Sequence, residues 1–313
     1  MICWVTGAGG QVGTALCLQL TNQGHHVIGI GRGNAPTLFP GQWIKWNIGI
    51  ERRPNQVINA PDWIFHLAGQ TSAYRARDDL AMDIQVNVLG FSEILLAAVE
   101  AGTRPFVVIA GAATEVGMVD ELVIDDTAKD NPQTFYDVGK TVQSLYLRQF
   151  AREGWLHSCK LRFANVYGGL ASRESDRGFL NNSVTRALSG KPLTYFANGT
   201  YTRDYLFVED AASSLIAASI NPEFTGEQSF MIGTGCGTTI RQALMQISKI
   251  VYEFTGILAP VVSIDPPDDL YAIERRDAVI DSSRFQQGTG WAPVTSLDVG
   301  ITKMVQRALT ESQ

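Results

Sequence analysis

The chain contains no long uninterrupted apolar run and no basic cluster. None of its apolar segments approaches the roughly 18 consecutive apolar residues that a membrane-spanning helix needs. Met1 is followed at once by an apolar segment that predicts a buried strand, so we expect no signal peptide. The formal net charge of −6 argues against a nucleic-acid partner, although a few arginines would suffice for an anionic substrate. We therefore expect a cytoplasmic globular protein with no membrane or nucleic-acid partner.

Cysteine and histidine are scarce. The cysteines are scattered and three of them lie in apolar segments, which predicts core residues in a reducing compartment instead of a disulfide framework. The histidines show no spacing typical of metal ligands, so we predict no metal site. The residues concerned are Cys3, Cys17, Cys159, Cys236, His25, His26, His66 and His157.

The chain does contain a regular alternation of short β-branched runs and amphipathic stretches. This alternation predicts a parallel sheet with helices on both faces. Several apolar runs lack polar alternation, as strands buried on both sides do. The expected strands are Ile2–Thr6, His26–Ile30, Trp43–Trp46, Trp63–Leu67, Phe106–Ala110 and Lys160–Phe163, and the expected helices are Gln11–Asn22, Val86–Glu100 and Tyr136–Arg152.

The pattern changes after Phe163. Residues 168–182 are polar, glycine-bearing and charged, which predicts a loop, and shorter mixed elements follow. The 313 residues suffice for a nucleotide-binding domain and a smaller lobe. We predict an α/β fold in which residues 1–165 form a Rossmann-type doubly wound parallel sheet, to which segments near 204–235 return. Residues 166–313 mainly form a smaller C-terminal α/β substrate lobe.

A glycine-rich turn, TGAGGQVG, follows the first expected strand and opens the first expected helix. Gly7 can take backbone angles closed to other residues, Gly10 lets the main chain approach a pyrophosphate, and Gly13 lets the helix pack against the strand. The helix N-terminus offers unpaired N–H groups to the phosphates. In this context the spacing predicts dinucleotide binding and not merely a tight turn.

The end of the second expected strand bears on the choice between NAD and NADP. NAD proteins tend to place a carboxylate there for the ribose hydroxyl, whereas Ile30-Gly31-Arg32 contains no acid. Arg32 can pair with a ribose phosphate through its planar fork, or it can lie in a solvated loop. The sequence favours NADP and leaves NAD open.

Tyr136 and Lys140 lie four residues apart in an expected helix, so their side chains share one face. A free tyrosine, with a pKa of about 10, is a poor base at neutral pH. A nearby ammonium and an oxidised nicotinamide ring favour the phenolate, and the lysine can also anchor the nicotinamide ribose. This spacing often occurs by chance, but here it lies one strand–helix unit beyond Phe106–Ala110. It predicts a proton relay.

Further segments occur in an order shared with a known family. They are HLAGQ at 66–70, NVLG at 87–90, LRFANVYG at 161–168, RDYLFVED at 203–210 and GWAP at 290–293. Together with the glycine turn, Tyr136 and Lys140, they resemble the extended short-chain dehydrogenase/reductase family, in particular its NAD(P)-dependent nucleotide-sugar epimerase/dehydratase branch. The likeness covers nearly the whole chain.

The resemblance implies an NAD(P)-dependent enzyme that acts on a nucleoside-diphosphate sugar. Arg203 and Asn165 would contact the diphosphate and Arg275 or Arg276 would close over it, unless Arg203 forms a structural ion pair with Asp204 or Glu209. The loop at 168–182 and the segment 192–196 would flank the base, although Tyr195 and Phe196 could equally be core aromatics. The implied cofactor contacts are Gly7, Gly10, Gln11, Val12, Gly13, Arg32, Leu67, Ala68, Gly69, Asn87, Tyr136 and Lys140, and the implied substrate contacts are Gln70, Asn165, Arg203 and Arg276.

The sequence departs from the family pattern where a serine or threonine after the fifth strand usually bonds the substrate oxygen. That position falls on Ala112, or on Gly111 when counted from the strand. We favour Thr114 as the substitute, but the enzyme could run on Tyr136 and Lys140 alone, or be catalytically impaired. The loss of one such donor typically costs on the order of a hundredfold in rate, which slows a reaction without excluding it.

The same stretch bears on the type of reaction. Family members that eliminate water usually carry an Asp–Glu pair directly after that hydroxyl, where this chain has Ala113 and Thr114, with Glu115 one place late. Elimination needs both an acid and a base, and Glu115 could simply be a surface or capping carboxylate. We therefore expect epimerisation or keto reduction, and dehydration less.

Two rival functions and one assembly remain open. The chain could be an NAD(P)H-binding sensor or scaffold, or a reductase of small aldehydes or flavonoid-like ketones that would not require Arg203. The resemblance also implies a homodimer through a four-helix bundle around Val86–Glu100 and Asp137–Arg152.

Overall fold

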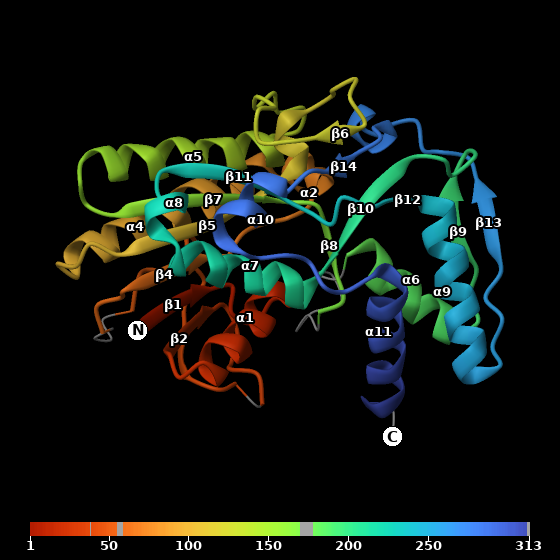
Figure 1. The fold of residues 1–313 in the computed structure, drawn as a ribbon, viewed down its shortest axis with the longest axis horizontal. Coiled ribbons are helices and arrows are strands. Elements are labelled where there is room, and N and C mark those ends of the chain that lie inside the picture. The colour runs from red at the N-terminus through yellow and green to blue at the C-terminus, as the bar shows by residue number, and fades with distance from the viewer. Residues whose placement is uncertain (38, 55–58, 170–177, 312–313) are drawn as a thin grey trace.

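The computed structural model describes residues 1–37, 39–54, 59–169 and 178–311. Seven parallel strands form the main sheet, in the order β11-β7-β5-β4-β1-β2-β3 (Figure 1). They are β1 (Ile2–Thr6), β2 (His26–Gly31), β3 (Gln42–Lys45), β4 (Trp63–His66), β5 (Phe106–Ala112), β7 (His157–Phe163) and β11 (Gln228–Ile232). All six expected strands occur, and the predicted fold class is confirmed. β5 runs on to Ala112 because residues 110–112 pair in register with residues 161–163 of β7.

Helices cover both faces of this sheet, as the buried-run pattern predicts. α1 (Gln11–Asn22) and α7 (Val208–Ile220) contribute to the core on one face, while α4 (Gly90–Glu100) and α5 (Phe135–Arg152) contribute to the core on the other. From β1 the chain steps to β2 and β3 in one direction, and from β4 to β5 and β7 in the opposite direction. The strand order therefore reverses between β1 and β4, and ligands of such sheets bind at the carboxyl ends of the strands at this point.

The helix before β5 is longer than expected and not regular. It consists of α3 (Leu80–Asp83), a π-helix η1 (Ile84–Leu89) and α4. By length and composition alone, Leu80–Glu100 would suffice to cross a membrane. In the fold, however, Phe91, Ile94 and Leu95 are fully buried against the sheet, as in the core helix of a globular domain.

The C-terminal lobe has its own core around a three-stranded sheet, in the order β12-β10-β8. In Figure 1 it lies to the right of the main sheet. Within the segment near 204–235, α7 packs on α1 and β11 joins the main sheet, but β10 lies in the lobe. The lobe elements are β8 (Asn165–Tyr167), α6 (Phe179–Leu188), β9 (Leu193–Phe196), β10 (Thr202–Phe207), β12 (Gly237–Thr239), α9 (Ile240–Thr255), β13 (Val261–Ile264) and α11 (Leu297–Glu311).

The loop expected at 168–182 can be described only in part, because residues 170–177 lie outside the described residues and Phe179 already begins α6.

Cys3, Cys17 and Cys159 are buried and Cys236 is exposed, and all four are unpaired. In the described part of the chain, no group of three or more His, Cys, Asp or Glu residues could hold a metal ion. The remaining elements are α2 (Ala73–Asp78), η2 (Ala113–Val116), β6 (Val123–Ile124), α8 (Pro222–Thr225), η4 (Ala272–Arg275), β14 (Val279–Ile280) and α10 (Ser283–Thr289).

Candidate active site

The glycine turn lies at the point where the strand order reverses. Gly7 has a φ of +67°, and a Cβ atom added to it would lie 2.8 Å from the backbone N of Ala68. A Cβ atom on Gly13 would lie 2.2 Å from Gly7 O, so α1 could not pack this closely with any side chain there. At Gly10 the only described neighbour within 4 Å of an added Cβ is Gly7 O, at 3.1 Å. Among the described residues the turn is therefore crowded on the protein side and open at Gly10, where a pyrophosphate could approach.

Thr6 joins the glycine turn to the segment that follows β4. Its hydroxyl oxygen accepts hydrogen bonds from the backbone N–H groups of Leu67 and Ala68, both at 3.1 Å. The hydroxyl must then donate its hydrogen to His66 Nδ1, 3.0 Å away, which leaves the histidine proton on Nε2. Burial, with a smaller contribution from Lys140, lowers the pKa of His66 to about 3, so the ring is neutral.

Three further predicted cofactor contacts lie around this turn. Gln11 and Val12 form the first turn of α1, whose N-cap Gly10 makes no side-chain cap. Arg32 directly follows β2, next to β1 in the sheet. Gly31 is needed beside it, because an added Cβ would lie 2.7 Å from the Trp43 ring.

Lys140 lies against the segment that follows β4. A Cβ atom added to Gly69 would lie 2.8 Å from Asn87 Oδ1 and 4.0 Å from Lys140 Nζ. Gln70 N donates to Asn87 Oδ1 at 2.9 Å, and Asn87 Nδ2 donates to Gln70 O at 3.1 Å. The ammonium of Lys140 donates to Gln143 Oε1 at 3.0 Å. The structure thus brings Gly69, Gln70, Asn87 and Lys140 together. They lie at the carboxyl ends of the parallel strands, where the glycine turn also lies.

Tyr136 lies in the first turn of α5, which Thr134 caps by accepting a hydrogen bond from Asp137 N. Its hydroxyl makes no hydrogen bond to any described residue. Burial raises the pKa of Tyr136, and the negative charges of Glu115, Asp137 and Asp83 raise it further. The protein by itself therefore shifts this pKa away from neutrality, opposite to the shift expected with a neighbouring ammonium and an oxidised nicotinamide ring.

Thr114 does not lie as its predicted role requires. Its hydroxyl donates to Asp137 Oδ1 at 2.5 Å, and the Thr134 hydroxyl donates to the other oxygen of the same carboxylate at 2.7 Å. A hydroxyl has one hydrogen to donate. In this arrangement Thr114 cannot also donate to a substrate oxygen, and it acts instead as a support for the start of α5.

Glu115 is not a surface residue, but it does act as a capping carboxylate at the start of η2. Its side chain is fully buried, accepts from Ala112 N at 2.7 Å and forms an ion pair with Lys160. Gly111 makes the room for this pair, because an added Cβ would lie 2.6 Å from Lys160 Cε and 2.7 Å from Glu115 Oε1. Gly111 therefore faces the ion pair.

The two arginines expected to hold a diphosphate bind the protein's own backbone. Arg203 donates to the carbonyl oxygens of residues 202, 274 and 276 and lies 3.8 Å from Glu274 Oε2. Arg276 is buried and donates to Gly117 O and, at 3.3 Å, to Ala113 O. Arg203 thus pairs with neither Asp204 nor Glu209, the two partners considered from the sequence.

Residues 269–276, which we call the strap, connect the lobe to the main domain. Arg77 of α2 forms an ion pair with Asp269 at 2.9 Å, and the rings of Tyr74 and Tyr271 lie 5.1 Å apart. Through Arg276 the strap also contacts the turn at 113–117. The strap therefore spans from α2 to the turn beside Tyr136.

The third predicted substrate residue, Asn165, is exposed at the start of β8. It pairs in register with Tyr205 of β10, so both side chains and Arg203 share one face of the lobe sheet. The Tyr205 hydroxyl is buried and has no hydrogen-bond partner among the described residues. Tyr195 is partly buried against the core of the lobe, and Phe196 is 36% exposed.

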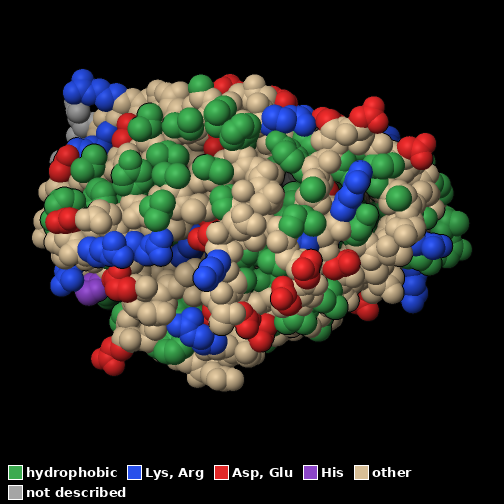
Figure 2. Space-filling view, turned by 90° about the horizontal axis from the view of Figure 1, so that it is seen from above, with side chains coloured by type: hydrophobic (Ala, Val, Ile, Leu, Met, Phe, Trp, Pro, Cys, Tyr) green, Lys and Arg blue, Asp and Glu red, His purple; other side chains and the backbone are tan. Residues whose placement is uncertain are grey.

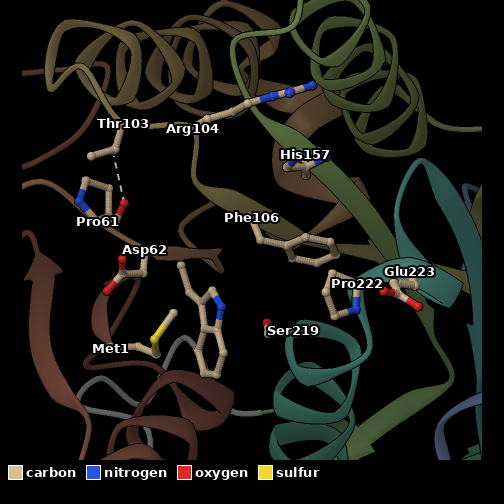
Figure 3. Close-up of a pocket in the computed structure, with 11 residues that line it drawn as sticks. Met1, Pro61, Asp62, Thr103, Arg104, Phe106, His157, Ser219, Pro222 and Glu223 are labelled. Atoms are coloured by element: carbon tan, nitrogen blue, oxygen red, sulfur yellow. Dashed lines mark hydrogen bonds between the residues drawn. The ribbon is translucent and has the colours of Figure 1, made fainter.

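A large surface hollow lies elsewhere. It has a volume of about 550 Å³ and is lined by residues at the amino ends of the strands, among them Asp62, Trp63, Phe106 and His157 (Figure 3). These residues precede or begin β4, β5 and β7, whereas Tyr136 and the glycine turn lie at the carboxyl ends. The hollow is thus separate from the candidate site.

Sequence reasoning missed several residues that support the site. Gln143 lies one helical turn after Lys140, and that i, i+3 spacing was the available signal. The pairing of Glu115 with Lys160, 45 residues apart, had no local signal. The other missed residues are Thr6, Asp83, Thr134, Asp137 and Tyr205.

Known proteins match this chain along its length. The family model "NAD dependent epimerase/dehydratase family" matches residues 3–233. UDP-glucose 4-epimerase of Mycolicibacterium smegmatis is 29% identical over 326 residues, with 99% of each chain covered. The crystal structure of Thermotoga maritima UDP-glucose 4-epimerase with UDP-glucose is 25% identical, with a TM-score of 0.86 and 100% of each chain covered. That of Thermus thermophilus UDP-glucose 4-epimerase with NAD is 22% identical, with a TM-score of 0.81 and 98% of each chain covered.

These matches confirm the resemblance drawn from the sequence, the doubly wound fold and the expectation of an NAD(P)-dependent enzyme from a family that acts on nucleotide sugars. The match to the family model extends over well more than half of the chain and includes the glycine turn, Tyr136 and Lys140. The chain belongs to the NAD dependent epimerase/dehydratase family.

Proposed function

We propose that this protein interconverts or reduces a nucleoside-diphosphate sugar by hydride transfer, with Tyr136 as the proton relay. The observation that carries the proposal is the position of Lys140 beside Gly69 and Asn87, at the same sheet edge as the glycine turn. The open side of Gly10, the α1 N-terminus and Lys140 would hold the dinucleotide. When bound, the nicotinamide supplies or accepts the hydride.

Tyr136 exchanges a proton with the oxygen of the reacting sugar carbon, and Lys140 stabilises the phenolate. Because burial and three carboxylates raise the pKa of Tyr136 in the protein alone, the positive charge of an oxidised nicotinamide ring is needed to lower it. With Thr114 bound to Asp137, the reaction runs on Tyr136 and Lys140, without a hydroxyl at Ala112.

Epimerisation of a UDP-hexose is the reaction that the named relatives favour. Purified protein incubated with UDP-glucose should form UDP-galactose without net consumption of added NAD(P)H, measured by chromatography of the sugar nucleotides. A ketoreductase would instead oxidise NADPH in proportion to a 4-keto sugar nucleotide. NADPH binding without turnover of any sugar nucleotide would support the sensor or scaffold, and would overturn the proposed activity.

The substrate class depends on Arg203 and Asn165, which share one face of the lobe sheet. Arginine holds a diphosphate through paired charge-assisted hydrogen bonds. To do so, Arg203 must exchange its carbonyl partners in residues 274 and 276 for phosphate oxygens. An Arg203→Ala variant with unchanged KM for a sugar nucleotide would support the rival reductase of small aldehydes or ketones.

We propose NADP as the preferred dinucleotide, with NAD as the alternative. Arg32 after β2 and the absence of an acid there support NADP, while the solved Thermus relative carries NAD. Fluorescence titration with NADPH and NADH tests the preference. An Arg32→Ala variant should weaken NADPH more than NADH, and an equal effect on both would contradict the assignment.

We also propose a homodimer in the cytoplasm, formed through α4 and α5. Leu89, Leu96, Val138, Leu145 and Tyr146 are all more than two-fifths exposed on the helical layer that covers one face of the sheet. Hydrophobic side chains gather on the left half of the face in Figure 2, the half on which α5 lies in Figure 1. Sedimentation should show a dimer that a Leu145→Glu variant converts to monomer, and a monomeric parent protein would contradict this.

A further inference from the structure

Gln143 connects Lys140 to the backbone of the neighbouring helix. Its Oε1 accepts from Lys140 Nζ at 3.0 Å, and its Nε2 donates to Asn87 O at 2.6 Å. The side chain is fully buried, so both ends of its amide are used inside the protein. In the described part of the chain, Gln143 Oε1 is the one acceptor that Lys140 Nζ reaches.

The far end of this bridge is held firmly. Asn87 lies in the π-helix η1, and π-helical turns occur frequently at functional sites. Its side chain exchanges two hydrogen bonds with the backbone of Gln70 and donates a third to Asp83 Oδ1 at 2.8 Å. The carbonyl that receives Gln143 is therefore fixed relative to the segment beside the glycine turn.

We propose that Gln143 is a positioning residue, which aims the Lys140 ammonium at the cofactor and the Tyr136 oxygen by tying it to Asn87 O. This inference rests on the proposed function for the role of Lys140. A bare lysine on a four-carbon stem has many rotamers, and one fixed acceptor restricts them. The bridge also gives the buried ammonium a hydrogen-bond acceptor that carries no charge.

Four titratable groups from neighbouring elements interact with Lys140. Glu115 of η2 and Asp83 of α3 favour its protonated form, Lys160 of β7 disfavours it, and His66 of β4 is neutral. Burial is the largest influence and lowers the pKa of Lys140 to about 8. A change at Gln143 therefore acts on a lysine that titrates within an accessible pH range.

Two substitutions at this position should shift the Lys140 pKa in opposite directions. Gln143→Leu removes the acceptor from the ammonium, which lowers the pKa, whereas Gln143→Glu supplies a carboxylate, which raises it. Gln19→Leu is the matched control, because Gln19 is also a helix glutamine that donates to a backbone carbonyl, that of Glu209, at 2.9 Å.

The pKa is measured by NMR titration of full-length protein labelled with ε-¹³C-lysine. The chain has seven lysines, and a Lys140→Arg variant assigns the resonance. We expect a downward shift of about one unit in Gln143→Leu, an upward shift in Gln143→Glu and none in Gln19→Leu. If both Gln143 variants leave this pKa unchanged or shift it the same way, the proposal is wrong. If Gln143→Leu does not fold, Gln143→Glu decides alone.

The second measurement is the pH profile of kcat with its companion KM. If Lys140 acts as an ammonium, the alkaline fall of kcat moves to lower pH in Gln143→Leu and to higher pH in Gln143→Glu, with KM for the sugar nucleotide nearly constant. A loss of kcat without any movement of the profile would indicate a merely structural role and overturn the proposal. The NMR titration needs no turnover, so it tests the bridge even if the proposed reaction fails.

Discussion

The two sides of the candidate site differ in what their polar groups bind. On the main-sheet side, Thr6 accepts hydrogen bonds from the backbone of Leu67 and Ala68, and Gln70 and Asn87 bond to each other. On the lobe side, Arg203 and Arg276 are already bound to backbone carbonyls. Under the proposed function, the main-sheet side is the cofactor half and is already ordered, whereas the lobe side is the substrate half and must exchange internal contacts for a ligand, which would reduce affinity.

The largest effect is expected at the cofactor half. Tyr136→Phe removes the proton relay but keeps the ring, so turnover should fall by roughly a hundredfold to ten-thousandfold. NADPH affinity should change little, which fluorescence titration measures. Tyr252→Phe, at an exposed tyrosine of α9 away from the proposed dimer face, is the control. If NADPH affinity fell in Tyr136→Phe by the same factor as turnover, Tyr136 would be a cofactor-binding residue and not the proton relay.

The buried ion pair beneath the site should matter for stability. Lys160→Met leaves Glu115 buried without its partner, and the unfolding free energy in urea should drop by about 3–5 kcal/mol. Adding Glu115→Gln should restore much of it. Lys303→Met, which removes an exposed pair with Glu209, should cost less than about 1 kcal/mol. Equal losses for the two lysines would contradict the buried role.

A hydroxyl introduced at Ala112 should supply the side-chain donor to the substrate oxygen that the family pattern predicts near this position. We expect Ala112→Ser to raise kcat by about tenfold to a hundredfold, because it supplies an oxyanion donor. Thr114→Val should mainly lower the melting temperature, since Thr114 supports Asp137. The opposite result would be no gain of kcat in Ala112→Ser and a hundredfold loss of kcat in Thr114→Val. It would indicate that Thr114 donates to the substrate oxygen, as the sequence first suggested.

The smallest effect is expected at the strap. Asp269→Asn weakens the pair with Arg77, and an ion pair at such an exposed site contributes little to stability. If the strap competes for Arg203, UDP should bind about twofold more tightly, as calorimetry would measure. Asp268→Asn, at the exposed neighbouring residue, is the control. Weaker UDP binding in Asp269→Asn would mean that the strap helps to build the substrate half.

The same contrast explains what the sequence could predict. The glycine turn and the Tyr136–Lys140 face depend on residues a few positions apart, and local spacing suffices to predict them. Two of the three carbonyl partners of Arg203 lie more than 70 residues away, at 274 and 276, and nothing local shows that its guanidinium will bind them instead of a phosphate. The π-helix also escaped prediction, because η1 has the same apolar character as the α-helices on either side of it.

Gly111, Glu115 and Lys160 form one coupled unit, although Lys160 lies 45 residues beyond Glu115 in the sequence. Any side chain at 111 would occupy the space of the carboxylate and the ammonium, so the glycine is a consequence of the ion pair and not a sign of lost chemistry. Substitutions at these three positions should therefore be non-additive. A side chain at 111 should therefore cost less stability in a protein in which both Glu115 and Lys160 have been replaced by uncharged residues.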